Sequence, residues 1–156
     1  MTIAQRLTEL GLELPPPARP VGSYVPVVRV GDVVITSGQL PLKAGQPMHV
    51  GKVPTDVPLP AAQAAAAQAC LNALAAVAAE CGSLDAVARV VRLNVFVNSS
   101  AGFVDQAKVA NGASDLLVAI FGDIGRHTRC AIGAAELPLN ACVELDLTVA
   151  LRPAAG

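Results

Sequence analysis

The chain has 156 residues, which is enough for one domain, and 53% of them are hydrophobic although only 3% are aromatic. The core must therefore be built from Ala, Val and Leu, which favours extensive packing of helices on a sheet. Eleven basic and twelve acidic residues leave a net charge of −1 without any basic run, which argues against a nucleic-acid partner.

The N-terminal segment predicts a short amphipathic helix over residues 2–10. Thr2 followed by Gln5 resembles a capping box, in which each residue satisfies a backbone N–H group of the first turn. Three consecutive prolines then force a stiff, extended connector. We assign residues 1–19 to this helix and connector, and residues 20–152 to a single domain.

The next two segments predict a β-hairpin. Tyr24–Val30 and Val33–Gln39 are rich in β-branched residues, and the dipeptide Gly31-Asp32 between them is a two-residue turn signal. Residues 43–58 contain several Gly and Pro residues and predict a loop.

A long Ala-rich segment follows, and it predicts a helix. Pro60 suits the first turn of a helix, and Gly82 is placed to end it. The span Leu59–Ala79 is the most apolar of the chain, but two Gln and one Asn interrupt it, so we expect a buried helix rather than a membrane span.

The second half of the chain predicts a strand, a helix and two more strands. In Arg89–Asn98 the alternation places Val91, Leu93, Val95 and Val97 on one face, and Arg92, Asn94, Phe96 and Asn98 on the other. Phe103–Phe121 has helical spacing. The last two strands are Arg129–Ala134 and Ala141–Leu151, separated by a Leu-Pro turn. The order ββαβαββ after a short helix predicts an α+β two-layer sandwich, with both long helices on one face of a mixed sheet.

Two opposite charges stand out on the last two predicted strands. If these strands form a hairpin that is symmetric about Glu136–Leu137, Arg129 lies opposite Glu144, with Cβ atoms roughly 5 Å apart. Such a pair can be a simple cross-strand salt bridge, worth about 0.2–1 kcal/mol. It can also mark a ligand site, and geometry alone leaves both interpretations open.

The sequence around this pair resembles the C-terminal signature of the RidA/YjgF enamine/imine deaminase family. The segment from Arg129 to Pro138 reads Arg-Cys-x-Ile-x-x-Ala-x-Leu-Pro, and Val-Glu-Leu follows with Glu144 at its centre. Four further segments match in the expected order: Gly22–Val25, Ile35–Pro41, Val95–Val97 and Val109–Asn111. The resemblance covers residues 20–151, which is nearly the whole predicted domain.

This resemblance implies a chorismate-mutase-like fold and a homotrimer with three clefts between subunits. It implies hydrolysis of reactive 2-aminoacrylate-type enamines or imines to 2-keto acids and ammonia, without a cofactor or a metal. Arg129 would bind the substrate carboxylate, because its planar guanidinium can form a bidentate pair, and it would keep Glu144 ionised for positioning or activating a water. The residues expected to line the cleft are Tyr24, Ser37, Gly38 and Asn111.

The sequence departs from the family pattern at three places. His127-Thr128 precedes the arginine, where the family has a small Pro-Ala pair, and His127 either shares the cleft or lies solvated at the strand end. The family has a Cys two residues after the arginine, where this chain has Ala131, and Cys130 instead follows the arginine directly, so we expect Cys130 to face away as a small buried thiol. Asn111 is followed three residues later by Ser114, where the family more often has Tyr. Tyr24 itself can also be a packing residue of the hairpin.

Other functions remain to be weighed against the deaminase. A non-catalytic trimeric module that binds 2-keto acids would use the same clefts, whereas ribonuclease activity is disfavoured by the neutral charge. The four cysteines lack CxxC spacing, and no signal peptide is recognisable, so we expect reduced thiols in a cytoplasmic protein that has no membrane partner.

Overall fold

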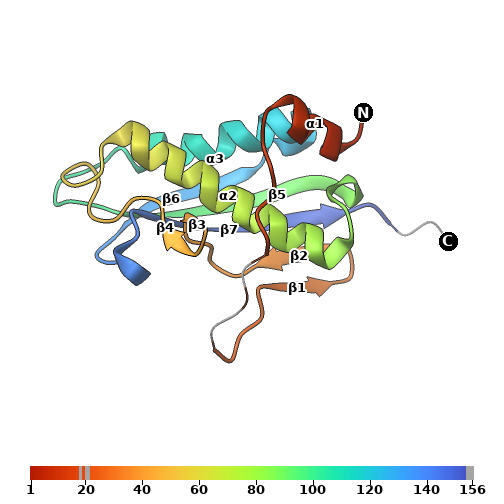
Figure 1. Cartoon of the computed structure of the whole chain (residues 1–156), viewed down its shortest axis with the longest axis horizontal. Coiled ribbons are helices and arrows are strands. Elements are labelled where there is room, and N and C mark those ends of the chain that lie inside the picture. Colours follow the sequence, from red (N-terminus) through yellow and green to blue (C-terminus); the bar gives the residue numbers. More distant parts are fainter. Residues whose placement is uncertain (18, 20–21, 154–156) are drawn as a thin grey trace.

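A five-stranded mixed sheet carries two long helices on one face in the computed structural model, which describes residues 1–17, 19 and 22–153 (Figure 1). The strand order is β1-β2-β7-β5-β6. The strands are β1 (Val27–Val30), β2 (Val33–Thr36), β5 (Val87–Asn98), β6 (Thr128–Ala134) and β7 (Val143–Leu151). The helices are α1 (Ile3–Glu9), α2 (Leu59–Cys81) and α3 (Gln106–Phe121). The predicted α+β sandwich with the order ββαβαββ is therefore confirmed.

The pairing predicted for the last two strands is wrong. β6 is parallel to β5, β7 is antiparallel to β5, and β5 therefore separates them. The reason is that β5, α3 and β6 form a strand–helix–strand unit, whose crossover returns the chain parallel to the strand it left. The Leu-Pro segment, Pro138–Asn140, is accordingly a 3-10 turn that leads the chain past the end of β5, and Leu139 adopts a left-handed φ of 56° there.

Helix α2 is the central helix of the domain. Pro60 lies in its first turn and Gly82 ends it with a left-handed φ of 78°, as predicted. By length and composition this helix is also apolar enough to cross a membrane, but 61% of its most apolar window is buried inside the fold. Its alanines allow α3 to come close: a Cβ atom added at Gly112 would overlap the backbone carbonyl of Gln63. Gly112 is therefore a packing residue between the two helices.

The N-terminal segment packs against the same layer. The predicted capping box of Thr2 and Gln5 is present, and Leu7 is buried in the core. The side chain of Arg6 donates from Nε to the carbonyl of Ala119 over 2.9 Å, which ties α1 to α3. Residue 20, where the predicted domain begins, lies outside the described residues.

Two details of the predicted elements differ from the structure. The register between β5 and β7 shifts between Val90 and Arg92, so Val90 is buried whereas Val91 is 39% exposed. Alternation along a strand cannot reveal such a bulge. The predicted loop over residues 43–58 contains part of a small hairpin, formed by β3 (Leu42–Lys43) and β4 (Gln46–Pro47).

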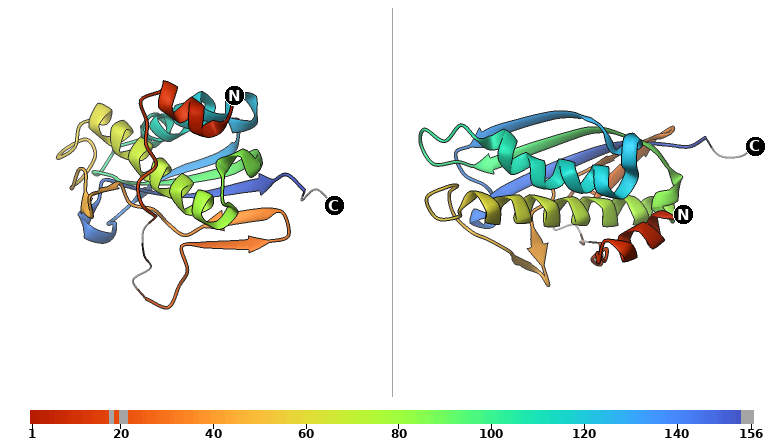
Figure 2. Two further views of the ribbon diagram at one scale, coloured as in Figure 1. Left: turned by 45° about the vertical axis from the view of Figure 1, so that its right-hand side comes forward. Right: turned by 90° about the horizontal axis from the view of Figure 1, so that it is seen from above.

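The sheet face that lies away from the helices carries no α-helix among the described residues, and we call it the open face (Figure 2). Its exposed apolar side chains are Val28, Val30, Val33, Ile35 and Ile132. A polar network lies beside them, in which Asn94 accepts from Arg92 over 2.9 Å and donates to Asp146 over 2.8 Å.

Candidate functional site

Arg129 points to the helix-covered side of the sheet. It is in register with the buried Leu93, and its side chain reaches α3, where Nη1 donates to Asn111 Oδ1 over 2.8 Å and to Ser114 Oγ over 3.0 Å. These two bonds use both hydrogens of Nη1. Among the described residues the other guanidinium nitrogens, Nε and Nη2, have no hydrogen-bond partner, and no carboxylate forms a salt bridge with Arg129. A half-buried cation held by neutral groups, with one edge unoccupied, is suited to bind a carboxylate.

His127 extends this group of polar side chains. Its Nε2 lies 3.0 Å from Ser114 Oγ, and its Nδ1 lies 2.6 Å from the backbone oxygen of Gly125. The imidazole is therefore part of the site and is not a freely solvated strand-end residue. We call Arg129, Asn111, Ser114 and His127 the guanidinium cluster.

Glu144 lies elsewhere, on the open face. It is in register with Phe96, and its carboxylate covers the backbone of Gly38, where an added Cβ would overlap Oε1. A cavity of about 390 Å³ opens beside it at the end of β2. The side chains and backbone around this cavity come from Glu144, Gly38, Tyr24, Arg19, Leu40 and Leu139, among others. We call it the carboxylate cavity.

The environment of Glu144 favours its neutral form. Burial raises the pKa of the carboxyl above its usual range, and the nearby negative charge of Asp146 raises it further. Among the described residues Arg129 is not one of the groups that shift this pKa, so the predicted influence of Arg129 on the charge of Glu144 is absent within a single chain. A raised pKa makes this carboxyl a better proton acceptor, once ionised, than an ordinary glutamate.

The predicted cross-strand contact between Arg129 and Glu144 is absent. They point to opposite faces of the sheet, with β5 between them, and their register positions on β5 differ by three residues, at Leu93 and Phe96. With about 4.8 Å between strands and about 3.3 Å per residue, the two Cα atoms are roughly 14 Å apart. They are neither a salt bridge nor a joint site within one chain.

The other predicted site residues divide between these two places. Asn111 joins the guanidinium cluster, and Tyr24 and Gly38 join the carboxylate cavity. Ser37 joins neither, because its hydroxyl donates to the carbonyl of Val25 over 2.6 Å and holds the chain before β1. Ser114 was not predicted as a site residue, although its helical spacing of three from Asn111 places both on one face.

Cys130 faces away from Arg129, as expected, since it is in register with Asn94 on the open face. It is half-buried there, whereas we predicted a buried thiol. Burial instead raises the pKa of two other thiols, to about 12 for Cys70 and about 11 for Cys142, so these two are unreactive.

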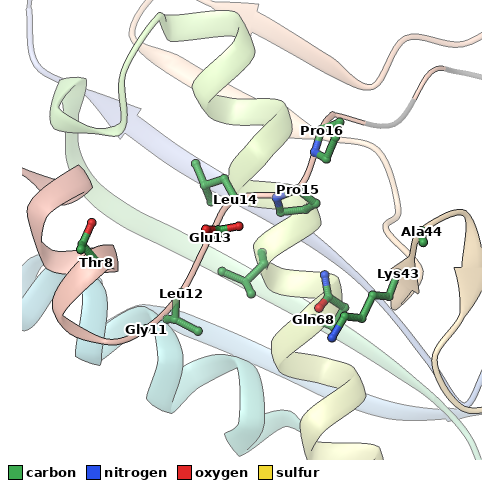
Figure 3. A pocket seen from close by; sticks show the side chains of 11 residues that line it. Thr8, Gly11, Leu12, Glu13, Leu14, Pro15, Pro16, Lys43, Ala44 and Gln68 are labelled. Atoms are coloured by element: carbon green, nitrogen blue, oxygen red, sulfur yellow. The ribbon is translucent and has the colours of Figure 1, made fainter.

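A roomier cavity of about 600 Å³ lies between the N-terminal connector, the β3–β4 hairpin and α2 (Figure 3). Figure 3 shows Leu14 and Pro15 of the connector, Lys43 of β3 and Gln68 of α2 around it. It contains none of the predicted site residues. The predicted site residues other than Ser37 therefore lie in the guanidinium cluster and the carboxylate cavity.

A protein-family model and a known protein each match nearly the whole chain. Residues 4–151 match the family model described as "YjgF/chorismate mutase-like, putative endoribonuclease". The Trypanosoma cruzi protein TCP17 is 45% identical over 151 residues, covering 96% of this chain and 94% of that protein.

Two solved structures have the same fold and differ in how similar they are to this chain. A "putative endoribonuclease" from Shewanella oneidensis MR-1 is 36% identical with a TM-score of 0.94, covering 97% of this chain and 100% of its own. Escherichia coli TdcF with bound serine is 26% identical with a TM-score of 0.62, covering 89% of this chain and 94% of its own.

Proposed function

Because the chain belongs to the YjgF/chorismate mutase-like family, we propose that it is a deaminase that hydrolyses reactive enamines and imines of the 2-aminoacrylate type to 2-keto acids and ammonia. One observation carries the proposal: the half-buried guanidinium of Arg129 presents an unoccupied edge and has no acidic partner among the described residues. A small carboxylate ligand would supply the missing anion.

The guanidinium cluster and the carboxylate cavity lie on opposite faces of the sheet. This arrangement supports a homotrimer in the proposal. In a closed ring, the guanidinium cluster of one subunit can meet the carboxylate cavity of the next, so that three clefts form between subunits. The open face supplies apolar surface for such contacts, since Val30 is 68% exposed and Ile35 is 46% exposed. The four free thiols fit a reducing cytoplasm.

The chemistry requires little beyond positioning. Protonation of an enamine at its β-carbon gives an iminium, whose C2 is already electrophilic. Arg129 would hold the carboxylate next to C2, and Glu144 would orient a water and accept one of its protons as the C–O bond forms. Transfer of that proton from Glu144 to the nitrogen then lets ammonia leave as the C–N bond breaks, the hydroxyl proton passes back to Glu144, and a 2-keto acid remains.

The test is a coupled assay with a serine or threonine dehydratase, in which release of the 2-keto acid is followed with and without the purified protein. We expect the wild type to accelerate release and Arg129→Ala to lose at least 100-fold in rate, as expected when a substrate-orienting group is removed. Arg152→Ala is the matched control, because Arg152 is exposed at the end of β7. No acceleration by the wild type with several amino-acid precursors would contradict the proposal.

A non-catalytic module that binds 2-keto acids or related metabolites is the second candidate. The relative TdcF holds serine, which is a small carboxylate of this kind. Binding of a 2-keto acid that depends on Arg129, without any turnover of imines, would favour this alternative. The word endoribonuclease in the family description gains no support here, because a net charge of −1 is unsuited to a polyanionic substrate.

A further inference from the structure

We infer that Ser114 and His127 are positioning residues, which form a one-directional hydrogen-bond relay that fixes the guanidinium of Arg129 before a ligand arrives. This inference rests on the proposed function for its kinetic consequences, although the relay itself can be measured without turnover. It assigns a role to His127, which replaces a small residue of the family pattern.

The direction of the relay follows from its end. The backbone oxygen of Gly125 can only accept, so the His127 Nδ1 atom that lies 2.6 Å away must carry the proton. In a neutral imidazole Nε2 is then an acceptor, and the hydroxyl of Ser114, 3.0 Å away, must donate to it. With its only proton used, Ser114 Oγ presents its lone pairs to Arg129.

Arg129 completes the relay as a donor. Its Nη1 gives one hydrogen to Ser114 Oγ over 3.0 Å and the other to Asn111 Oδ1 over 2.8 Å. Two acceptors on one nitrogen determine the plane of the guanidinium, because its donors have a rigid, planar geometry. The edge formed by Nε and Nη2 is thereby kept in one orientation, ready for a bidentate carboxylate.

The backbone that supports the relay is itself held by close packing. Gly125 is buried, and a Cβ added there would overlap the carbonyl of Leu117, so this glycine can lie directly against α3. Gly112, between the two acceptors on α3, lies equally close to α2. Glycines on both sides of the cluster therefore fix the positions of the first acceptor, Gly125 O, and of the helix that carries Asn111 and Ser114.

Removal of each residue has a different expected consequence. Ser114→Ala removes one of the two acceptors of Nη1, so the bound orientation must be organised by the substrate itself. We expect KM to rise roughly tenfold, the size of one hydrogen bond to a charged group, with a change in kcat below about threefold. Ser114→Thr keeps the hydroxyl and should restore KM.

His127→Ala should have a smaller effect, about threefold in KM, because the freed hydroxyl can still accept from Arg129 but can also turn to the helix carbonyl of Ala110. His127→Gln keeps an acceptor near the position of Nε2 and should restore most of the loss. His49→Gln is the matched control, since His49 lies in a loop outside the cluster.

A direct measurement is the tautomer of His127, read from the 15N chemical shifts of its ring in the wild-type protein at neutral pH. We expect the Nδ1–H tautomer, and a shift of the Nε2 signal in Ser114→Ala but not in Ser114→Thr. An Nε2–H tautomer, or a Ser114→Ala enzyme with the KM of the wild type, would overturn the inference. If the wild type turns over no imine, the proposed function fails, while the tautomer still decides whether the relay exists.

Discussion

The two faces of the sheet differ in how their side chains are covered, although the same strands form both. On the helix-covered face, α2 and α3 pack so closely that a glycine, Gly112, is required at their contact. On the open face, valine and isoleucine side chains remain exposed beside a polar network and Glu144. In the proposed function each face carries one half of the chemistry, so that a single chain would be complete as a fold but incomplete as a site.

The largest expected effect comes from placing a charge on the open face, which is the proposed interface between subunits. We expect Ile35→Lys to dissociate the proposed trimer, because an unpaired charge in an apolar interface costs several kcal/mol. Light scattering coupled to size-exclusion chromatography measures the change in mass. Val104→Lys, at an 83% exposed loop position, is the control that should keep the mass of the wild type. An Ile35→Lys protein that remains assembled would show that the open face is not the interface.

The close packing of the helix-covered face predicts the next effect. By helix propensity, Gly112→Ala should stabilise α3 by about 1 kcal/mol. Because the new methyl group would overlap the carbonyl of Gln63, we instead expect a loss of about 2–3 kcal/mol in the free energy of unfolding. Urea denaturation measures it. Asp115→Ala, an exposed change to alanine in the same helix, should leave stability the same or slightly raised.

A similar clash on the other face should affect activity and leave stability nearly unchanged. In Gly38→Ala the new methyl group occupies the place of the Glu144 carboxylate, so we expect kcat/KM to fall roughly tenfold or more. Gly38 is exposed, so unfolding should change by less than about 1 kcal/mol. Shortening the acid in the double variant Gly38→Ala/Glu144→Asp should relieve the clash. If the losses of the two single variants simply add, the contact is not the cause.

The elements of both faces were predictable because their signals are local. The capping box at Thr2, the helix end at Gly82 and the hairpin around Gly31 all depend on neighbours in sequence. The pairing of Arg129 with Glu144 failed because strand order is not local. Two consecutive strands look like a hairpin until the crossover through α3 is considered, and that crossover assigns β6 to the edge of β5.

The residues of the candidate site could be named from the sequence, whereas their arrangement in space could not. Family resemblance identified Arg129, Asn111, Tyr24, Gly38 and Glu144, which the structure places in two groups. Ser114 escaped because its hydroxyl stands where the family more often has a tyrosine. Its contact with His127 depends on the backbone of Gly125, and periodicity cannot position a loop carbonyl against a helix.

The smallest expected effect tests whether the polar network of the open face shifts the pKa of Glu144, the proposed catalytic carboxyl. Burial first, and then the charge of Asp146, raise the pKa of Glu144, so activity that needs ionised Glu144 must rise with pH at a higher pH than for an ordinary glutamate. Asp146→Asn removes that charge while its amide oxygen can still accept from Asn94, so the acid limb of the pH–rate profile should move to lower pH. This limb should still lie at a higher pH than that of an exposed carboxyl, because Glu144 remains half-buried. Arg19, which lines the cavity, should act equally in both proteins. Asp115→Asn, on the helix-covered side, is the control and should leave the acid limb at the same pH. If the limb is also unmoved in Asp146→Asn, the polar network has no electrostatic influence on Glu144.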